Sequence, residues 1–227
     1  MSIYRKYINF TDKNSINYKL RMARLALFEE LISSLPRPVR ILDVGGSEFY
    51  WEHLFFSDGR NNHDDFEITI TNVIESELKR SSQESSYYQY QVADARSMPQ
   101  FSDKQFDVVH SNSVIEHVGD HNDQINMAKE VKRIGKHYFV QTPNYWFPIE
   151  PHFRMIGWQW LPRSTRIALI QKRKFGSFPI ATSYKQAEEI VDSAQLLTYS
   201  NFRDCFPESR IEHEHFIGLT KSFIAMY

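Results

Sequence analysis

The feature that most constrains the fold is a short apolar run that ends at a pair of glycines. Residues Val39–Val44 (VRILDV) contain only two charged side chains and are followed by Gly45-Gly46. A run of this length and composition, bounded by glycines, predicts a buried strand. Before it, apolar residues recur at three- and four-residue spacing from Ile16 to Ser34, which predicts an amphipathic helix.

The rest of the chain alternates strand and helix patterns. Four further strands are predicted, with helical segments such as Asn122–Ile134 between several of them; these strands are Glu67–Thr71, Tyr87–Val92, Phe106–His110 and His137–Gln141. Such alternation implies an α/β fold in which a mostly parallel sheet carries helices on both faces. Near the C-terminus, Arg210–Leu219 and Ser222–Tyr227 are separated by Thr220-Lys221 and predict an antiparallel hairpin. The prediction is therefore a seven-stranded sheet.

Length and composition limit the class of protein. The 227 residues fit a single domain (1–227) with an N-terminal helical segment at 1–37. A net charge of −1 gives no reason to expect nucleic-acid binding, and no apolar stretch approaches the ~18 residues of a spanning helix. The start MSIYRKYINF lacks a leader pattern, and the single Cys205 predicts a small buried apolar group. A cytoplasmic protein without a transmembrane segment is the expectation.

One segment, residues 144–182, interrupts the alternation and is predicted to be an inserted lid or acceptor region. From Pro151 to Ala187 there is no acidic residue, whereas tryptophans and seven basic residues occur; the basic residues are Arg154, Arg163, Arg166, Lys172, Arg173, Lys174 and Lys185. Two interpretations stay open. The segment either packs its aromatic side chains on the body of the protein or binds an anionic or amphiphilic substrate, with peripheral membrane contact as a further option.

The glycine turn indicates the kind of ligand. At the carboxyl end of a parallel strand, glycines let the backbone come close to a small metabolite. A dinucleotide phosphate loop would need G-x-G-x-x-G, but here Gly45 and Gly46 are followed by Ser47 and the bulky Phe49. A pyrophosphate site is therefore disfavoured.

Four stretches, in order, resemble the class I S-adenosylmethionine-dependent methyltransferases, particularly their small type-11-like group. They are ILDVGG, ITITNVIES, VADARSMP and FDVVHSNSVIEHV, and they lie between Val39 and Val118. The resemblance implies a Rossmann-like fold, S-adenosylmethionine as the cofactor, and methyl transfer to a small-molecule acceptor.

The resemblance also implies the cofactor-binding residues. The motif positions are Asp43, Gly45, Gly46, Ser47, Asn72, Val73, Asp94, Ala95, Asn112 and Ser113. Asp43 and the turn Gly45–Ser47 would lie near the methionine part of the cofactor, and Asn112 and Ser113 would line the same part. Asp94 and the Ala95 N–H would bind the adenine, and Val73 would give it an apolar face. Asn72 departs from the family pattern, because an acidic residue usually accepts from the ribose hydroxyls at this position.

Methyl transfer needs a group that removes a proton when the acceptor is a weak nucleophile. The candidate bases are His117, Glu150 and His152, and Tyr145 and Trp146 are predicted to contact the substrate. All of these residues except His117 lie in a proline-rich run after the fifth strand, at the edge where open α/β sheets bind ligands. The alternative for His117 is a structural role beside Gly119.

No metal site is predicted, because the pairs His213/His215 and His117/His121 each lack a third ligand. For the acceptor, the working hypothesis is O-methylation of a sugar or a sugar-containing lipid precursor. The main alternative is a non-catalytic partner module that keeps the methyltransferase fold, and a nicotinamide-dependent oxidoreductase ranks last because the phosphate-binding glycines are missing.

Overall fold

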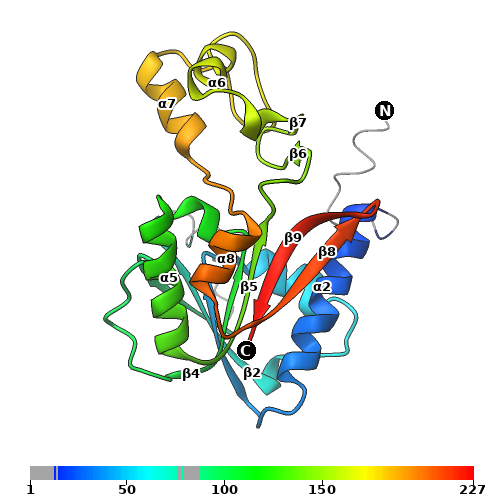
Figure 1. Cartoon of the computed structure of the whole chain (residues 1–227). Coiled ribbons are helices and arrows are strands. Elements are labelled where there is room, and N and C mark those ends of the chain that lie inside the picture. Colours follow the sequence, from blue (N-terminus) through cyan, green and yellow to red (C-terminus); the bar gives the residue numbers. More distant parts are fainter. Residues whose placement is uncertain (1–12, 14, 76–77, 79–86) are drawn as a thin grey trace. The chain divides into compact units, whose positions relative to one another are not determined.

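A computed structural model describes residues 13, 15–75, 78 and 87–227 of the chain (Figure 1). The chain divides into two compact units. Unit 1 holds the described residues up to Asn112, together with Glu130–Val140 and Met226–Tyr227. Unit 2 holds Ser113–Lys129 and Gln141–Ala225.

The predicted seven-stranded sheet is confirmed, with strand order β3-β2-β1-β4-β5-β9-β8. The strands are β1 (Val39–Val44), β2 (Phe66–Asn72), β3 (Tyr88–Val92), β4 (Phe106–Asn112), β5 (Gly135–Pro143), β8 (Arg210–Phe216) and β9 (Leu219–Met226). β1 pairs in parallel with β2 and β4, and β2 pairs in parallel with β3. The chain therefore has the mostly parallel, Rossmann-like sheet that the alternation predicts.

Helices and short turns connect the strands. Ranges in unit 1 are α2 (Ile16–Ile32), α3 (Glu48–Tyr50), the π-helical turn η1 (Trp51–Phe55) and the 3-10 turn η2 (His63–Asp65). Helix α5 (His121–Ile134) belongs to both units. In unit 2 the ranges are η3 (Ile115–His117), β6 (Ile149–Glu150), β7 (Met155–Ile156), η4 (Trp158–Trp160), α6 (Arg163–Ile170), α7 (Tyr184–Asp192) and α8 (Tyr199–Cys205). No helix in the described part of the chain has the length and apolar character needed to cross a membrane.

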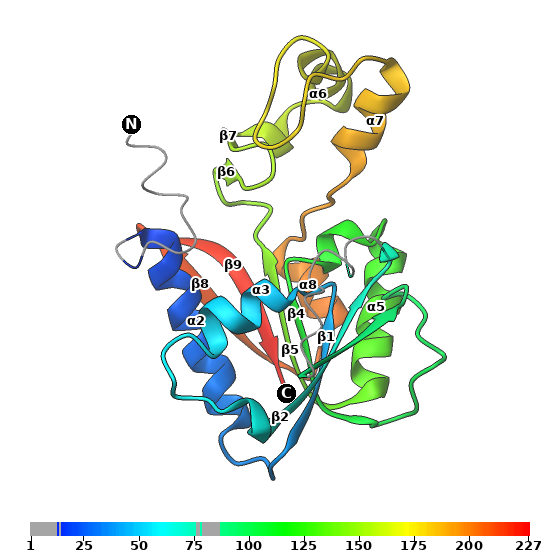
Figure 2. The same cartoon turned by 180° about the vertical axis from the view of Figure 1, so that it is seen from behind.

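The core of unit 1 is organised around Phe28. Helix α2 starts at the N-cap Ser15, whose hydroxyl accepts from the Tyr18 N–H at 3.1 Å. Phe28, on its buried face, makes edge contacts with the rings of Trp51 and His110 at centroid distances of 6.0 and 5.1 Å. α2 and η1 therefore pack together over the inner strands, as Figure 2 shows for α2 and the α3 segment that runs into η1.

Unit 2 has a hydrophobic core of its own. Its buried members are Phe153, Trp158, Ile167, Ile170, Phe175, Ala181, Ala187 and Val191. Helices α6 and α7 lie side by side (Figures 1 and 2), and Arg163 joins them through ion pairs to Asp192 and Glu188 at 2.6 and 2.9 Å. The inserted segment thus packs its aromatic side chains on one another, and its core continues past residue 182 to Val191.

The C-terminal hairpin is present, but the predicted turn at Thr220-Lys221 is wrong. The strands end at Phe216 and resume at Leu219, so the turn is Ile217-Gly218. Both turn residues have positive φ, 50° and 74°, as a two-residue hairpin turn that matches strand twist requires. Ile217 gave no turn signal because β-branched residues rarely adopt this conformation.

The strain at Ile217 generates a stability prediction. Asn tolerates the left-handed region far better than Ile, and the Ile217 side chain is 83% exposed, so little packing is lost on replacement. Ile217→Asn should raise the free energy of unfolding by about 1 kcal/mol in urea denaturation. The exposed Ile180, whose φ is ordinary, is the control: Ile180→Asn should change stability by less than about 0.5 kcal/mol. Equal effects of the two substitutions would contradict the role of the turn.

Candidate functional site

In unit 1, the loops that follow β1, β2 and β3 lie side by side. The Gly45 N–H donates to the Thr71 carbonyl at 2.7 Å, and the Ala93 N–H donates to the Asn72 carbonyl at 3.1 Å. Asn72 is also in register with Val92. The carboxyl ends of three parallel strands therefore form one edge, where open α/β sheets bind their ligands. This edge carries Asp43, Asn72 and Asp94.

Asp43 supports the glycine turn from within the core. Its carboxylate is 1% exposed and accepts from Trp51 Nε1 at 2.7 Å and from His110 Nδ1 at 2.8 Å. A Cβ at Gly46 would lie 1.7 Å from Asp43 Oδ2, so only glycine fits there. Both carboxylate oxygens thus have donors within the protein, and sequence reasoning missed these donors, which come from a distant strand and a short turn.

Asn72 is the last residue of β2, and Val73 directly follows the strand. The Asn72 side chain accepts from the Ile74 N–H at 3.0 Å, which closes a local turn. Val73 is 64% exposed, which is unusual for an aliphatic side chain at the end of a buried strand. An uncovered apolar side chain at this edge can contact a flat apolar ring.

Asp94 presents a charged carboxylate after β3. It forms an ion pair with Arg96 at 2.7 Å, and its carboxylate is 40% exposed. The hydrogen bond from Arg96 is the main cause that lowers the pKa of Asp94, so the group is a hydrogen-bond acceptor at neutral pH. Ala95, in the same turn, is half-buried.

Asn112 and Ser113 belong to different units. In unit 1, Asn112 Oδ1 accepts from Arg24 Nη1 at 2.5 Å. Arg24 is only 8% exposed and lies among the apolar residues on the buried face of α2. A basic residue at such a position is the sequence signal that could have identified it. In unit 2, Ser113 has a φ of 59° and donates to Gln141 Oε1 at 2.9 Å.

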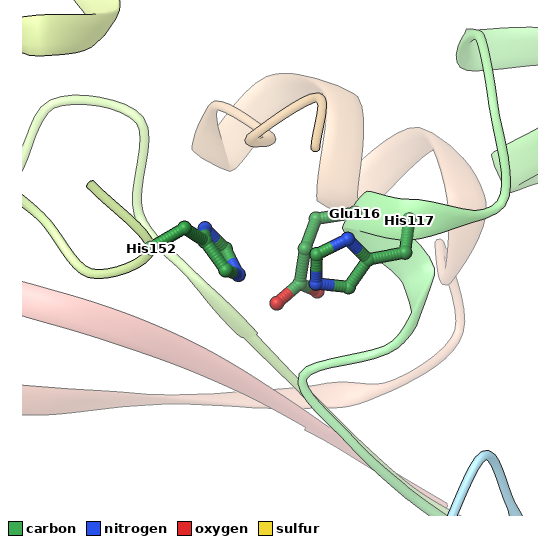
Figure 3. A group of neighbouring side chains, drawn as sticks. All are labelled: Glu116, His117 and His152. Carbon is green, nitrogen blue, oxygen red and sulfur yellow. The ribbon is translucent and has the colours of Figure 1, made fainter. Parts of the chain in front are cut away.

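Unit 2 gathers three titratable side chains that are far apart in sequence. Glu116 and His117 lie on η3, and His152 follows β6. Figure 3 shows both imidazole rings turned toward the Glu116 carboxylate. The ring centroids of the two histidines are 4.7 Å apart, with the rings nearly perpendicular at 83°. Of the predicted bases, the structure therefore brings His117 and His152 together.

Each histidine is oriented by an acceptor at its Nδ1. His117 Nδ1 lies 2.7 Å from the Ser193 carbonyl oxygen, and His152 Nδ1 lies 2.7 Å from Glu150 Oε1. A carbonyl oxygen can only accept, so the neutral His117 ring carries its proton on Nδ1 and has a lone pair on Nε2. The third predicted base, Glu150, is 2% exposed and also accepts from the Phe153 N–H. Its role here is to orient His152.

Burial and charge shift the pKa values in this cluster. Burial raises the pKa of Glu116, which is fully buried and accepts from the Thr142 hydroxyl at 3.0 Å. Burial alone would lower the pKa of His152, but the hydrogen bond and charge of Glu150, with the charge of Glu116, outweigh it and raise that pKa above its ordinary value. Sequence reasoning did not single out Glu116, although it lies in the quoted FDVVHSNSVIEHV stretch.

The cluster also has the composition of a metal site. One ligand atom from each of Glu116, His117 and His152 lies within 4.8 Å of the others. Bonds of 2.0–2.1 Å to a tetrahedral ion would bring ligand atoms to about 3.4 Å from one another, so the three side chains would have to close in on a cation.

A cavity of about 370 Å³ adjoins the cluster within unit 2. Its lining includes Glu150, the hydrogen-bond partner of His152, and Gln195, whose N–H donates to the Glu116 carbonyl at 2.6 Å. Of the two predicted substrate-binding residues, Tyr145 lines the cavity. Trp146 does not: it is 62% exposed, with its ring 6.5 Å from that of Trp160.

Comparison with protein families and curated proteins gives two findings. Residues 42–138 match the family model described as "Methyltransferase domain". The uncharacterized proteins Rv1509 and MT1557, from two strains of Mycobacterium tuberculosis, are each 28% identical over 141 residues, which cover 60% of this chain. The matched region spans 46% of each relative, less than half its length.

Several solved structures share the fold. PH0226 protein from Pyrococcus horikoshii OT3 aligns with a TM-score of 0.57 at 17% identity, covering 99% of this chain and 96% of that chain. The CurJ carbon methyltransferase aligns with a TM-score of 0.61 at 13% identity, and the alignment covers 96% of this chain and 55% of that chain. Phosphoethanolamine N-methyltransferase 2 from Haemonchus contortus, solved with S-adenosyl-L-methionine, aligns with a TM-score of 0.51 at 12% identity. The alignment covers 84% of this chain and 38% of that chain.

The support of the glycine turn by Trp51 can be tested through stability. Trp51→Phe removes the Nε1 donor and leaves Asp43 Oδ2 buried without that partner. We expect the free energy of unfolding in urea to fall by at least about 1–3 kcal/mol. Trp160→Phe is the control, because Trp160 is 45% exposed and should change stability little. An unchanged stability of Trp51→Phe would mean that this hydrogen bond does not support the turn.

Proposed function

We propose that the chain is a class I S-adenosylmethionine-dependent methyltransferase that methylates an oxygen of a small-molecule acceptor bound in unit 2, which the family match over residues 42–138 and the shared fold support. The cofactor we propose is S-adenosylmethionine, with which the Haemonchus contortus enzyme of similar fold was solved. The acceptor we propose is a sugar or a sugar-containing lipid precursor. The curated relatives are matched over less than half of their own length, so the proposed activity is not extended to them.

We assign cofactor binding to the strand-end edge of unit 1. When bound, S-adenosylmethionine supplies a methyl group that its sulfonium already activates. The ionised carboxylate of Asp94 suits the adenine amino group, and the exposed Val73 suits an adenine face. The loop at Gly45 and Gly46, supported by Asp43, leaves the backbone bare for close approach.

The observation that carries the acceptor side is the pair of oriented imidazoles in unit 2. An acceptor hydroxyl must lose its proton as its oxygen forms the new bond to carbon, and an imidazole Nε2 lone pair can take that proton. His117 and His152 each have Nδ1 bound to an acceptor, which orients Nε2. Glu150 would stabilise the imidazolium that forms on His152, because the charges attract.

Exposed apolar side chains on unit 2 support an amphiphilic acceptor. Trp146 and Trp160 have neighbouring rings, and the cross-strand pair Ile149 and Ile156 is also exposed. Tryptophan faces suit sugar rings, and aliphatic side chains suit a lipid tail. For the compartment we propose the reducing cytoplasm, since a chain with one cysteine, Cys205, cannot form a disulfide within itself.

A non-catalytic module with the same fold is the second candidate, and the observation that favours it is Asn72. An amide there carries no charge toward the ribose hydroxyls, and its side chain closes a local turn with Ile74. Release of S-adenosylhomocysteine with a panel of hydroxylated carbohydrates separates the candidates. Binding of S-adenosylmethionine without release for any acceptor would favour the module.

The cofactor assignment predicts the effect of removing the Asp94 carboxylate. Asp94→Ala should weaken S-adenosylmethionine binding by about 10- to 100-fold in titration calorimetry, because a charge-assisted hydrogen bond is lost. Asp58→Ala is a matched control, since Asp58 pairs with Arg60 two residues on, as Asp94 does with Arg96. It should leave the affinity unchanged. An unaltered affinity of Asp94→Ala would count against the assignment.

The base assignment predicts a shift in pH dependence. The pKa of His152 is raised by Glu150, so His152 is protonated, and unable to act as a base, over a wider acidic range than an ordinary histidine. Glu150→Gln removes the charge and should lower the pKa of His152, which moves the acidic limb of the kcat profile to lower pH. The pKa is measured by NMR titration of the imidazole, with His152→Ala used to assign its signals. Glu189→Gln, at an exposed position on α7, should leave it unchanged. A limb that does not move would rule out His152.

A further inference from the structure

Four buried side-chain polar atoms in unit 2 have no hydrogen-bond partner in the described part of the chain, and three of them belong to residues that line the same cavity. These three atoms are Trp158 Nε1, Gln159 Oε1 and Arg166 Nε. Trp158 and Gln159 are 1% and 9% exposed, so bulk water does not satisfy them. Buried polar atoms without partners are costly, and several around one cavity indicate a polar occupant.

The cavity lining includes one basic side chain, Arg166, and two acidic ones, Glu150 and Asp192, whose charges act on Arg166 without forming an ion pair with it in the described part of the chain. Glu150 uses one carboxylate oxygen for His152 and the other for the Phe153 N–H. Both carboxylate oxygens of Asp192 accept hydrogen bonds from the guanidinium of Arg163. Within the residues that the structure describes, Arg166 has neither a hydrogen bond nor an ion pair to its side chain.

The side chain of Arg166 is held in place although no described residue forms a hydrogen bond or ion pair with it. It lies on α6 next to the core residue Ile167, and its side chain is half-buried. Burial lowers its pKa, which reflects a charge kept partly out of water, but a guanidinium stays protonated at neutral pH. A partly desolvated guanidinium without a carboxylate partner attracts an anion more strongly than an exposed one does.

We propose that this cavity binds the methyl acceptor through a carboxylate or phosphate group, with Arg166 and Trp158 as donors to the anion and Gln159 as acceptor from a neighbouring hydroxyl. This deepens the proposed function, on which it rests, by naming the acceptor class: a hydroxylated acid such as an acidic or phosphorylated sugar. The guanidinium fork suits either oxyanion. The Gln159 side-chain nitrogen already donates to the Tyr145 and Phe147 carbonyls, which leaves Oε1 as the atom available to a ligand hydroxyl.

The size and position of the cavity agree with such a ligand. A volume of about 370 Å³ is at the small end of ligand sites and suits one sugar ring. Glu150 both lines the cavity and binds His152, so a ligand held by its acidic group at Arg166 would have its hydroxyls near the proposed base. The same contacts would disfavour a neutral sugar, because nothing would then pair with the guanidinium.

The test measures binding to the full chain without the cofactor, so that it is independent of methyl transfer. D-glucuronate, glucose 6-phosphate and neutral methyl glucoside are titrated and followed by NMR. We expect at least one acidic sugar to bind at least about tenfold more tightly than methyl glucoside, and Arg166→Gln to weaken that binding about tenfold or more. Trp158→Phe should give a smaller loss and Arg166→Lys a partial one. Arg173→Gln, on the same segment but with its guanidinium over the Phe175 ring, should have no effect.

The two acidic sugars distinguish a carboxylate from a phosphate ligand. Equal binding of methyl glucoside, absence of binding by both acids, or full affinity in a folded Arg166→Gln variant would each overturn the proposal. Folding is checked by circular dichroism; if Arg166→Gln does not fold, Arg166→Lys and Trp158→Phe decide the outcome. The His152→Ala variant separates this inference from the proposed function, since it should keep acid binding while losing methyl transfer. If wild-type protein binds the acid but releases no S-adenosylhomocysteine, the proposed function fails and the binding site stands.

Discussion

The strand-end edge of unit 1, to which we assign cofactor binding, depends on a buried carboxylate. Asp43 lies near the end of a central strand, where a buried polar group is stable only if hydrogen-bond partners surround it. Trp51 and His110 provide those donors from the turn after β1 and from β4. The bare backbone of Gly46 packs on the same carboxylate. One buried carboxylate therefore connects the strand, the glycine turn and the aromatic core around Phe28, and the position of the glycine turn is set from the interior.

Unit 2 uses the same physical device for a different purpose. Its two histidines each give Nδ1 to an oxygen acceptor, which orients the ring and leaves Nε2 for chemistry. Around them the polar atoms are only partly satisfied: Glu116 Oε1 lacks a partner in the described part of the chain, as do the three atoms around the cavity. Incomplete satisfaction in an interior that otherwise packs its own aromatic core is typical of a site that exchanges protons and ligands.

Much of the fold was predictable because strands and amphipathic helices are local patterns. The run Val39–Val44 became β1 without change, and the four other parallel strands lie within two residues of their predicted bounds. The hairpin turn was not predictable, since Ile217 carries no turn chemistry and its conformation is imposed by the strands on either side. Glu116 was overlooked for a related reason: its sequence neighbours do not reveal that Thr142 and the chain near Gln195 bury it.

The sequence by itself determined the order of strands and helices, the glycine turn after Asp43, and the residue types available for chemistry, because periodicity, backbone freedom and charge are properties of short segments. The tertiary structure alone decided which donors satisfy Asp43, and that Glu116, His117 and His152 lie together. It also decided that Arg163 pairs with two carboxylates whereas Arg166, one turn later on α6, has no ion pair with any described residue. Those outcomes depend on packing between segments distant in the chain. The local pattern around each residue carries no record of such neighbours.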